Sequence, residues 1–139
     1  MGGDGLFIER RFRGPPESGN GGYSCGLLGV LLGAPAEVTL RIPPPLETTL
    51  AVEQLPGGGL AATHEGTVVM EAMPTAIDVV VPNGVSLADA EAASKRFAGF
   101  DDHAFPTCFV CGPDRDEGDG LRIFPGDVGG GASAAPWTP

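Results

Sequence analysis

The chain places a run of backbone amide groups where a helix is expected to start. Asn20, Gly21 and Gly22 stand at the entry to a long apolar segment. The first N–H groups of a helix have no partner within it and carry about half a positive charge, which suits an oxygen that becomes negative during acyl transfer. Asn20 equally suits the capping position, with the glycines allowing close packing, and the two roles are compatible.

Two side chains are candidates for the general base that such donors need. Glu17 lies just ahead of the apolar segment, where the alternative is an exposed carboxylate near a helix dipole. His64 shares a face of an expected strand with Leu60 and Ala62, so it is a candidate base, a contact for the nucleotide part of a substrate, or a structural residue. Residues 21–35 contain no acidic side chain, so the helix itself offers no base.

The segment at residues 21–33 predicts a helix that is buried on every side, because its leucines and valine leave no polar face. Its glycines fall on one narrow stripe. Glycine costs a helix about 1 kcal/mol per residue relative to alanine, so the stripe predicts the close approach of another backbone, such as a sheet wrapped around the helix. The glycines of the stripe are Gly22, Gly26, Gly29 and Gly33.

Extended segments surround this helix. Alternation of apolar and polar residues, together with strand-forming residue types, predicts one strand before the helix and an antiparallel meander after it. The expected extended segments are residues 6–12, 37–42, 49–53, 60–64, 67–72 and 76–81. Glu65 and Gly66 predict a tight turn between two of them. The order of strand, apolar helix and antiparallel meander predicts an α+β fold.

The remainder of the chain predicts less regular structure. Ser86 and Asp89 have the spacing of a capping box and start a second helix that extends to about Phe97. Residues 99–103 are expected to be a linker and residues 121–124 a short strand. The last fifteen residues contain four glycines and three prolines and show no periodicity. The helix residues expected to face a core are Leu87, Ala90 and Phe97.

A long apolar helix wrapped by an antiparallel sheet is the layout of the hotdog fold. The helix entry at residues 14–23, Gly-Pro-Pro-Glu-Ser-Gly-Asn-Gly-Gly-Tyr, resembles that of actinobacterial-type hotdog thioesterase-like proteins. The Cys-x-x-Cys-Gly segment at residues 108–112, followed by Gly120 and Leu121, is similar to the segment that commonly opens phenylacetate-type hotdog thioesterases. Two such openings imply a tandem, or double, hotdog protein.

The resemblance implies an α+β hotdog fold, in which a curved antiparallel sheet wraps around the central apolar helix. Residues 5–82 would form the hotdog domain, residues 83–104 a helix and linker, and residues 105–139 the beginning of a second, incomplete hotdog unit. On this interpretation either the chain is truncated, which we favour, or its tail does something other than fold as a hotdog unit. Its first unit is expected to pair with a second hotdog unit or with a second copy of itself as a homo-oligomer.

The same resemblance implies an acyl-CoA thioesterase that hydrolyses or binds an acyl-CoA thioester, without a cofactor. The N–H of Gly21 would polarise the thioester carbonyl, with Gly22 and Tyr23 as neighbours in contact with the substrate. The relatives carry an acid about two turns further along the helix, at a position matched here by Gly29. This departure favours the alternative of a non-catalytic half that binds acyl groups or completes a pseudo-dimer.

Three arginines form a basic cluster in an acidic chain: Arg10, Arg11 and Arg13. They are candidates to bind the phosphates of coenzyme A, with Arg13 as the substrate contact. Arginines on the exposed face of a strand are the commoner arrangement. The cluster is therefore expected either at the phosphates of the substrate or in solvent.

Cys108 and Cys111, followed by Gly112, have the spacing of half a zinc knuckle. A structural zinc needs four ligands, and few residues remain to complete the set, so no metal is expected. The remaining candidates are Cys25, His64 and His103. A thioredoxin-like redox pair opens a helix, whereas the Gly-Pro that follows here predicts a turn.

Composition limits the classes of partner. The chain has 139 residues, a formal net charge of −10 and 42% hydrophobic residues, which suit a packed domain and argue against binding to nucleic acid or to a membrane surface. No apolar stretch reaches the ~20 residues that span a bilayer, and the chain starts without the basic segment of a secretory signal. Three cysteines, an odd number, build no disulfide framework, so a reducing cytoplasm is the expected compartment.

Overall fold

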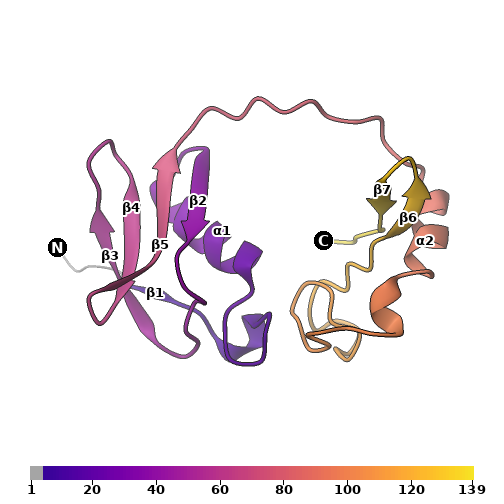
Figure 1. The fold of residues 1–139 in the computed structure, drawn as a ribbon, viewed down its shortest axis with the longest axis horizontal. Coiled ribbons are helices and arrows are strands. Elements are labelled where there is room, and N and C mark those ends of the chain that lie inside the picture. Colours follow the sequence, from indigo (N-terminus) through magenta and orange to yellow (C-terminus); the bar gives the residue numbers. More distant parts are fainter. Residues whose placement is uncertain (1–4) are drawn as a thin grey trace. The chain divides into compact units, whose positions relative to one another are not determined.

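The computed structural model describes residues 5–139, which form two compact units (Figure 1). The first unit ends at Val79, and the second takes in Val80–Pro139. The expected helix and linker at residues 83–104 therefore belong to the second compact unit. That residues 105–139 begin a second hotdog unit stays a prediction.

Within the described residues, the first unit contains a five-stranded antiparallel sheet that is strongly curled (Figure 1). Its strands, in spatial order, are β1 (Leu6–Phe7), β3 (Thr49–Gln54), β4 (Leu60–His64), β5 (Thr67–Pro74) and β2 (Ala36–Leu40). Each neighbouring pair is antiparallel. The expectation of an α+β fold with a curved antiparallel sheet is confirmed.

A tight turn joins β4 and β5, as the sequence predicts. Glu65 and Gly66 both have positive φ, 49° and 78°, the backbone conformation that matches the twist of a two-residue hairpin. The register of the pair shifts between Ala62 and Thr63. Because such a bulge bends its strand and increases the local twist, this shift contributes to the curl of the sheet.

Helix α1 (Gly21–Leu32) follows β1 in the chain and packs against the sheet. It starts where the sequence predicts, with the Oδ1 of Asn20 accepting a hydrogen bond from the N–H of Tyr23 at 3.0 Å. It ends at Gly33, whose φ of 71° is the left-handed conformation common after a helix. Leu28 is the helix residue that enters the shared core. The core residues are Leu6, Ile8, Leu28, Leu50, Leu60, Ala62, Val69, Met70 and Ala72.

The prediction that this helix is buried on every side is wrong. Leu28 is buried, whereas Val30 and Leu31 are 80% and 49% exposed. A methyl group added at Gly26 or Gly29 would meet no atom within 4 Å, so no described backbone approaches this part of the glycine stripe. The physical reason is that the curled sheet covers one side of the helix and leaves the opposite side open.

Two expected strands also differ in the structure. Only the first two of residues 6–12 form a strand, β1, and Arg10–Phe12 form a short 3-10 helix, η1. Phe7 pairs with Thr49, the first residue of β3, so β3 offers no partner to the residues after Phe7. Residues 76–81 form no strand, and Val80 is 97% exposed. A sequence of β-forming residues becomes a strand when a neighbour supplies its hydrogen bonds, and no described strand lies beside this one.

The second unit contains helix α2 (Leu87–Ser94), the 3-10 helix η2 (Ala98–Phe100) and a hairpin of β6 (Gly126–Gly129) and β7 (Ala132–Ala134). The predicted cap of α2 is confirmed, because the N–H of Asp89 donates to the Oγ of Ser86 at 3.1 Å. Ala90 and Ala93 are buried, but Leu87 is 66% exposed, so its predicted place in the core is wrong. The hairpin contacts α2 through small residues, and these do not cover Leu87 at the start of the helix.

The segment expected to be a linker, residues 99–103, takes part in a cluster of packed aromatic rings. The ring of Phe97 lies 5.4 Å from that of Phe100 and 5.5 Å from that of Phe124, centroid to centroid. The expected linker at residues 99–103 is therefore partly η2 and carries part of a packed aromatic cluster. Residues 121–124 form no strand, because Phe124 joins this cluster and the chain pairs only from β6 onward.

Candidate functional site

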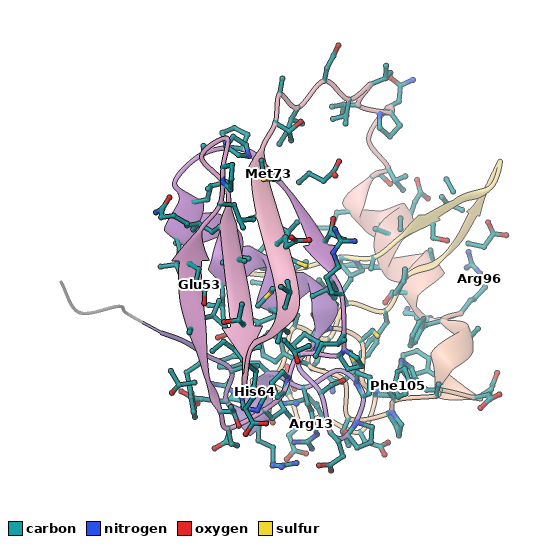
Figure 2. All side chains as sticks on the ribbon, turned by 60° about the vertical axis from the view of Figure 1, so that its left-hand side comes forward. Arg13, Glu53, His64, Met73, Arg96 and Phe105 are labelled. Carbon is teal, nitrogen blue, oxygen red and sulfur yellow. The ribbon has the colours of Figure 1, made fainter. Side chains whose placement is uncertain are left out.

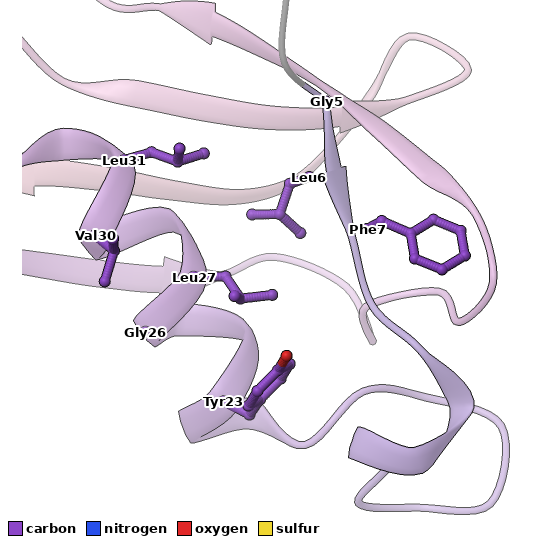
Figure 3. A pocket seen from close by; sticks show the side chains of 8 residues that line it. All are labelled: Gly5, Leu6, Phe7, Tyr23, Gly26, Leu27, Val30 and Leu31. Atoms are coloured by element: carbon purple, nitrogen blue, oxygen red, sulfur yellow. The ribbon is translucent and has the colours of Figure 1, made fainter.

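An apolar groove of about 440 Å³ runs between α1 and β1 in the first unit (Figure 3). Its helix wall consists of side chains three or four residues apart, which therefore lie on one face of α1. Gly26 has no side chain, which widens the groove at its centre. The lining residues are Gly5, Leu6, Phe7, Tyr23, Gly26, Leu27, Val30 and Leu31. A groove of this size and character suits an apolar chain.

Tyr23 provides the polar group at one end of the groove (Figure 3). Its ring stacks on Phe12 with centroids 4.0 Å apart and planes 10° apart. Burial and the carboxylate of Glu9 raise the pKa of the Tyr23 phenol, against a smaller lowering by Arg11. The phenol therefore stays protonated at neutral pH and presents an O–H donor to the groove.

The start of α1 combines a cap with unused donors. Besides the bond from Tyr23 to the Asn20 side chain, the N–H and Oγ of Ser24 donate to the Asn20 carbonyl at 2.9 and 2.8 Å. The N–H groups of Gly21 and Gly22 have no hydrogen-bond partner among residues 5–139. These donors lie ahead of the groove, whose helix wall begins at Tyr23. The structure thus brings Asn20, both glycines and Tyr23 into one turn.

Neither candidate base lines the groove. Glu17 sits in the loop ahead of α1 with its side chain 84% exposed, and its carboxylate pairs with Arg10 at 3.5 Å. His64 is the last residue of β4, next to the hairpin turn and at the opposite end of the β4–β5 pair from Met73 (Figure 2). The imidazole of His64 makes no hydrogen bond with any described residue. The groove lining therefore holds no carboxylate and no imidazole in the part of the chain that the structure describes.

The arginine cluster lies on η1 and the residue that follows it, rather than on the expected strand. The guanidinium of Arg13 donates to the carbonyl of Arg10 at 3.3 Å. The guanidinium of Arg11 lies over the ring of Phe12, 5.6 Å from its centroid. Because Phe12 stacks on Tyr23, the cluster and the polar end of the groove are joined through two aromatic rings.

Sequence reasoning missed two groups of residues. It assigned Val30 and Leu31 to a buried core, although they form part of the open groove wall. It considered His103 only as a remaining zinc ligand and predicted no direct contact with Cys111, whereas the His103 Nε2 lies 3.3 Å from the Cys111 Sγ in the second unit. A signal for Val30 was available in the glycine stripe, which lies on the same open side of the helix, whereas Leu31 lies about half a turn away from Gly22 and gave no such signal. The five-residue interval from His103 to Cys108 gave no signal for the second.

The second unit holds the two cysteines of the Cys-x-x-Cys segment as thiols. Within residues 5–139, no three His, Cys, Asp or Glu side chains are arranged to hold a metal ion. None of the described helices has the length and apolar character needed to cross a bilayer. Comparisons with protein-family models, curated proteins and solved structures found no match for the chain.

Proposed function

We propose that the first unit is a hotdog-like domain that holds the acyl chain of an acyl-CoA thioester in the groove between α1 and β1. The observation that carries this proposal is the groove itself, about 440 Å³ in volume and lined by apolar side chains, with a phenol at one end. Binding sites for small ligands are concave and mostly apolar, with few polar groups that fix orientation. An acyl chain with a thioester at its end has this distribution of polarity.

The arrangement of the elements supports the hotdog part of the proposal. One apolar helix lies between the first two strands in the chain and packs against a curled antiparallel sheet. This layout agrees with the hotdog-like helix entry at residues 14–23. The outward side of α1 carries Val30 and Leu31, so pairing with a second copy or a second hotdog unit is part of the proposal.

Polarisation of the thioester is assigned to the start of α1. The N–H groups of Gly21 and Gly22 are unpaired within the described chain and carry the positive end of the helix dipole. Tyr23 follows them directly and lines the groove, so a thioester carbonyl at its polar end lies next to these donors. Arg13, which directly follows Phe12 in the chain, is the assigned contact for the phosphates of coenzyme A.

A non-catalytic binding half is the second candidate, and one observation favours it. No general base lines the groove among the described residues, while Glu17 is exposed and paired with Arg10. Hydrolysis by this unit would need Glu17, His64 or a group from a partner to reach the thioester. Binding needs only the groove and the donors.

The test is binding of octanoyl-CoA compared with free coenzyme A, measured by isothermal titration calorimetry. Gly26→Leu fills the groove and is expected to weaken octanoyl-CoA binding by about tenfold or more, that is, by ~1.4 kcal/mol. Gly29→Leu is the matched control. Both glycines lie on α1, and an added Cβ at either one would have no atom within 4 Å, but only Gly26 lines the groove. Equal affinity of the wild-type chain for the two ligands would exclude the groove as an acyl site.

Thiol release from short, medium and aryl acyl-CoAs separates the two candidates. Turnover that is lost in Glu17→Ala or in His64→Ala identifies the base and an enzyme. Binding of octanoyl-CoA without turnover identifies the non-catalytic half. Neither side chain is in the core, so both variants are expected to keep the fold.

A further inference from the structure

The Cys-x-x-Cys segment of the second unit is folded so that its two thiols meet. The N–H of Gly112 donates to the carbonyl of Cys108 at 2.8 Å, which closes the turn. A Cβ at Gly112 would lie 2.5 Å from the backbone N and O of Cys108, so only glycine permits this approach. The Cys108 thiol lies close enough to Cys111 to raise the pKa of the Cys111 thiol, and no disulfide joins the two cysteines.

Residues after the turn hold it in place. The guanidinium of Arg115, whose side chain is only 6% exposed, donates from Nε to the Thr107 carbonyl at 2.8 Å and pairs with Asp119 at 3.3 Å. The N–H of Leu121 donates to the Phe109 carbonyl at 2.8 Å. The loop that carries both cysteines is therefore fixed by hydrogen bonds and an ion pair from the residues that follow it.

The hydrogen bonds of His103 define which of its nitrogens carries the proton. Its Nδ1 accepts from the N–H of Phe105 at 2.9 Å, so in the neutral ring the proton is on Nε2. That Nε2 lies 3.3 Å from the Sγ of Cys111 and donates toward the sulfur. A protonated Nε2 has no lone pair for a metal, so in this tautomer it acts as a donor to the sulfur. An N–H donor directed at sulfur favours the thiolate, and so opposes part of the burial that raises the pKa of the Cys111 thiol.

We propose that Cys108 and Cys111 form a dithiol that exchanges reversibly with small-molecule disulfides, with His103 as a positioning residue for the Cys111 sulfur. Cys111 is the attacking residue because it is partly exposed, whereas Cys108 is only 6% exposed. This pair lies in the second unit and does not depend on the acyl groove.

The exchange balances with glutathione disulfide as oxidant. The Cys111 thiolate, its proton lost to solvent, attacks one sulfur, forms a mixed disulfide and releases one glutathione thiolate, which takes up a proton. The Cys108 thiolate, formed in the same way, then attacks the Cys111 sulfur, closes the Cys108–Cys111 disulfide and releases the second glutathione. The protein loses two electrons and two protons, and the glutathione disulfide is reduced to two thiols.

The test uses the full chain carrying Cys25→Ser, so that the pair supplies all thiols. The chain is equilibrated in buffers with an increasing ratio of glutathione disulfide to glutathione. Thiol titration is expected to show the loss of both thiols, and intact mass is expected to show that no glutathione stays attached. Cys108→Ser is expected to retain one glutathione on Cys111. Cys111→Ser is the matched control and is expected to react at least about tenfold more slowly, because Cys108 is buried.

The role of His103 has its own readout. His103→Leu is expected to move the pH–rate profile of glutathione exchange to higher pH, and His103→Gln, which keeps an N–H donor, to restore part of the shift. A purely structural histidine would leave this profile unchanged in both variants. The dithiol proposal is overturned if the folded chain keeps both thiols in fully oxidised glutathione, or if it binds one zinc per chain that blocks both thiols. Equal rates for Cys108→Ser and Cys111→Ser would overturn the order of attack.

Discussion

The ring of Tyr23 lies flat on the ring of Phe12, with centroids 4.0 Å apart and planes inclined by 10°. Tyr23 belongs to the first turn of α1, and Phe12 ends η1. The stack therefore joins the segment that follows the edge strand β1 to the start of the helix. Since β1 and α1 are the two walls of the apolar groove, this contact holds the polar end of the groove at a defined width.

The first prediction concerns this stack. Phe12→Ala is expected to lower the free energy of unfolding of the first unit by about 2–4 kcal/mol, through lost burial and lost ring stacking. Tyr23→Phe keeps the ring and is expected to change the stability by less than ~0.5 kcal/mol. Urea unfolding followed by far-ultraviolet circular dichroism measures both. A loss in Tyr23→Phe as large as that in Phe12→Ala would show that the hydroxyl, and not the stack, holds the groove end.

The second prediction separates capping from catalysis at Asn20. Asn20→Ala removes the acceptor for the Tyr23 N–H and is expected to cost about 1 kcal/mol of stability. Asn20→Asp keeps an acceptor and is expected to preserve stability. If both variants bind octanoyl-CoA as the wild type does, Asn20 acts as a cap alone. A loss of binding in Asn20→Asp at full stability would instead point to a direct contact with the substrate.

The third prediction concerns the packing of the second unit. A Cβ at Gly126 would lie 1.7 Å from the carbonyl oxygen of Ala93, so Gly126→Ala forces the hairpin away from α2. The expected cost is about 3 kcal/mol. Gly84→Ala is the control, because an added Cβ there meets nothing within 4 Å. Trp137 is the single tryptophan and lies in the second unit, so its fluorescence during urea unfolding reports this unit.

The fourth prediction is a pH dependence at Cys111. Burial, together with Cys108, raises the pKa of the Cys111 thiol from 9.0 to about 11. The folded state thus favours the protonated thiol, so the stability contributed by this group is complete below pH 9 and declines as the pH rises towards about 11. Alkylation of Cys111 by iodoacetamide in the Cys25→Ser chain is expected to accelerate by about tenfold per pH unit between neutral pH and the pKa.

Among the described residues, the Cys108 thiol and the His103 imidazole lie beside Cys111. An alkylation rate that levels off near pH 8 would contradict the raised pKa. It would indicate that His103 stabilises the thiolate more strongly than burial opposes it. Cys108→Ser removes the contribution of the neighbouring thiol and is expected to move the midpoint of the profile to lower pH.

Local chemistry made several elements predictable from sequence. Asn20 and Gly33 mark the two ends of α1. A capping side chain and a glycine in the left-handed conformation each end a helix through contacts within one turn. Ser86 and Asp89 start α2 for the same reason. Glu65 and Gly66 place the hairpin turn, and the alternating segments around it become β3, β4 and β5. Each of these signals depends on residues that are neighbours in the chain.

Contacts between distant segments decided the rest. The composition of α1 predicts burial on every side, but the number and curl of the strands determine how much of a helix is covered, and they leave Val30 and Leu31 facing a groove. Residues 6–12 and 76–81 have strand-forming composition, yet a strand also needs a partner, which the fold supplies only to Leu6 and Phe7.

The sequence by itself determined the caps, the turns and the period of the strands, since these follow from interactions within a few residues. It also determined that residues 21–35 carry no acidic side chain. Only the tertiary structure decided that the open side of α1 meets β1 as an apolar groove, and that His103 directs its Nε2 toward Cys111. The physical reason is that burial and the approach of two side chains depend on how separate segments pack, which local residue preferences do not specify.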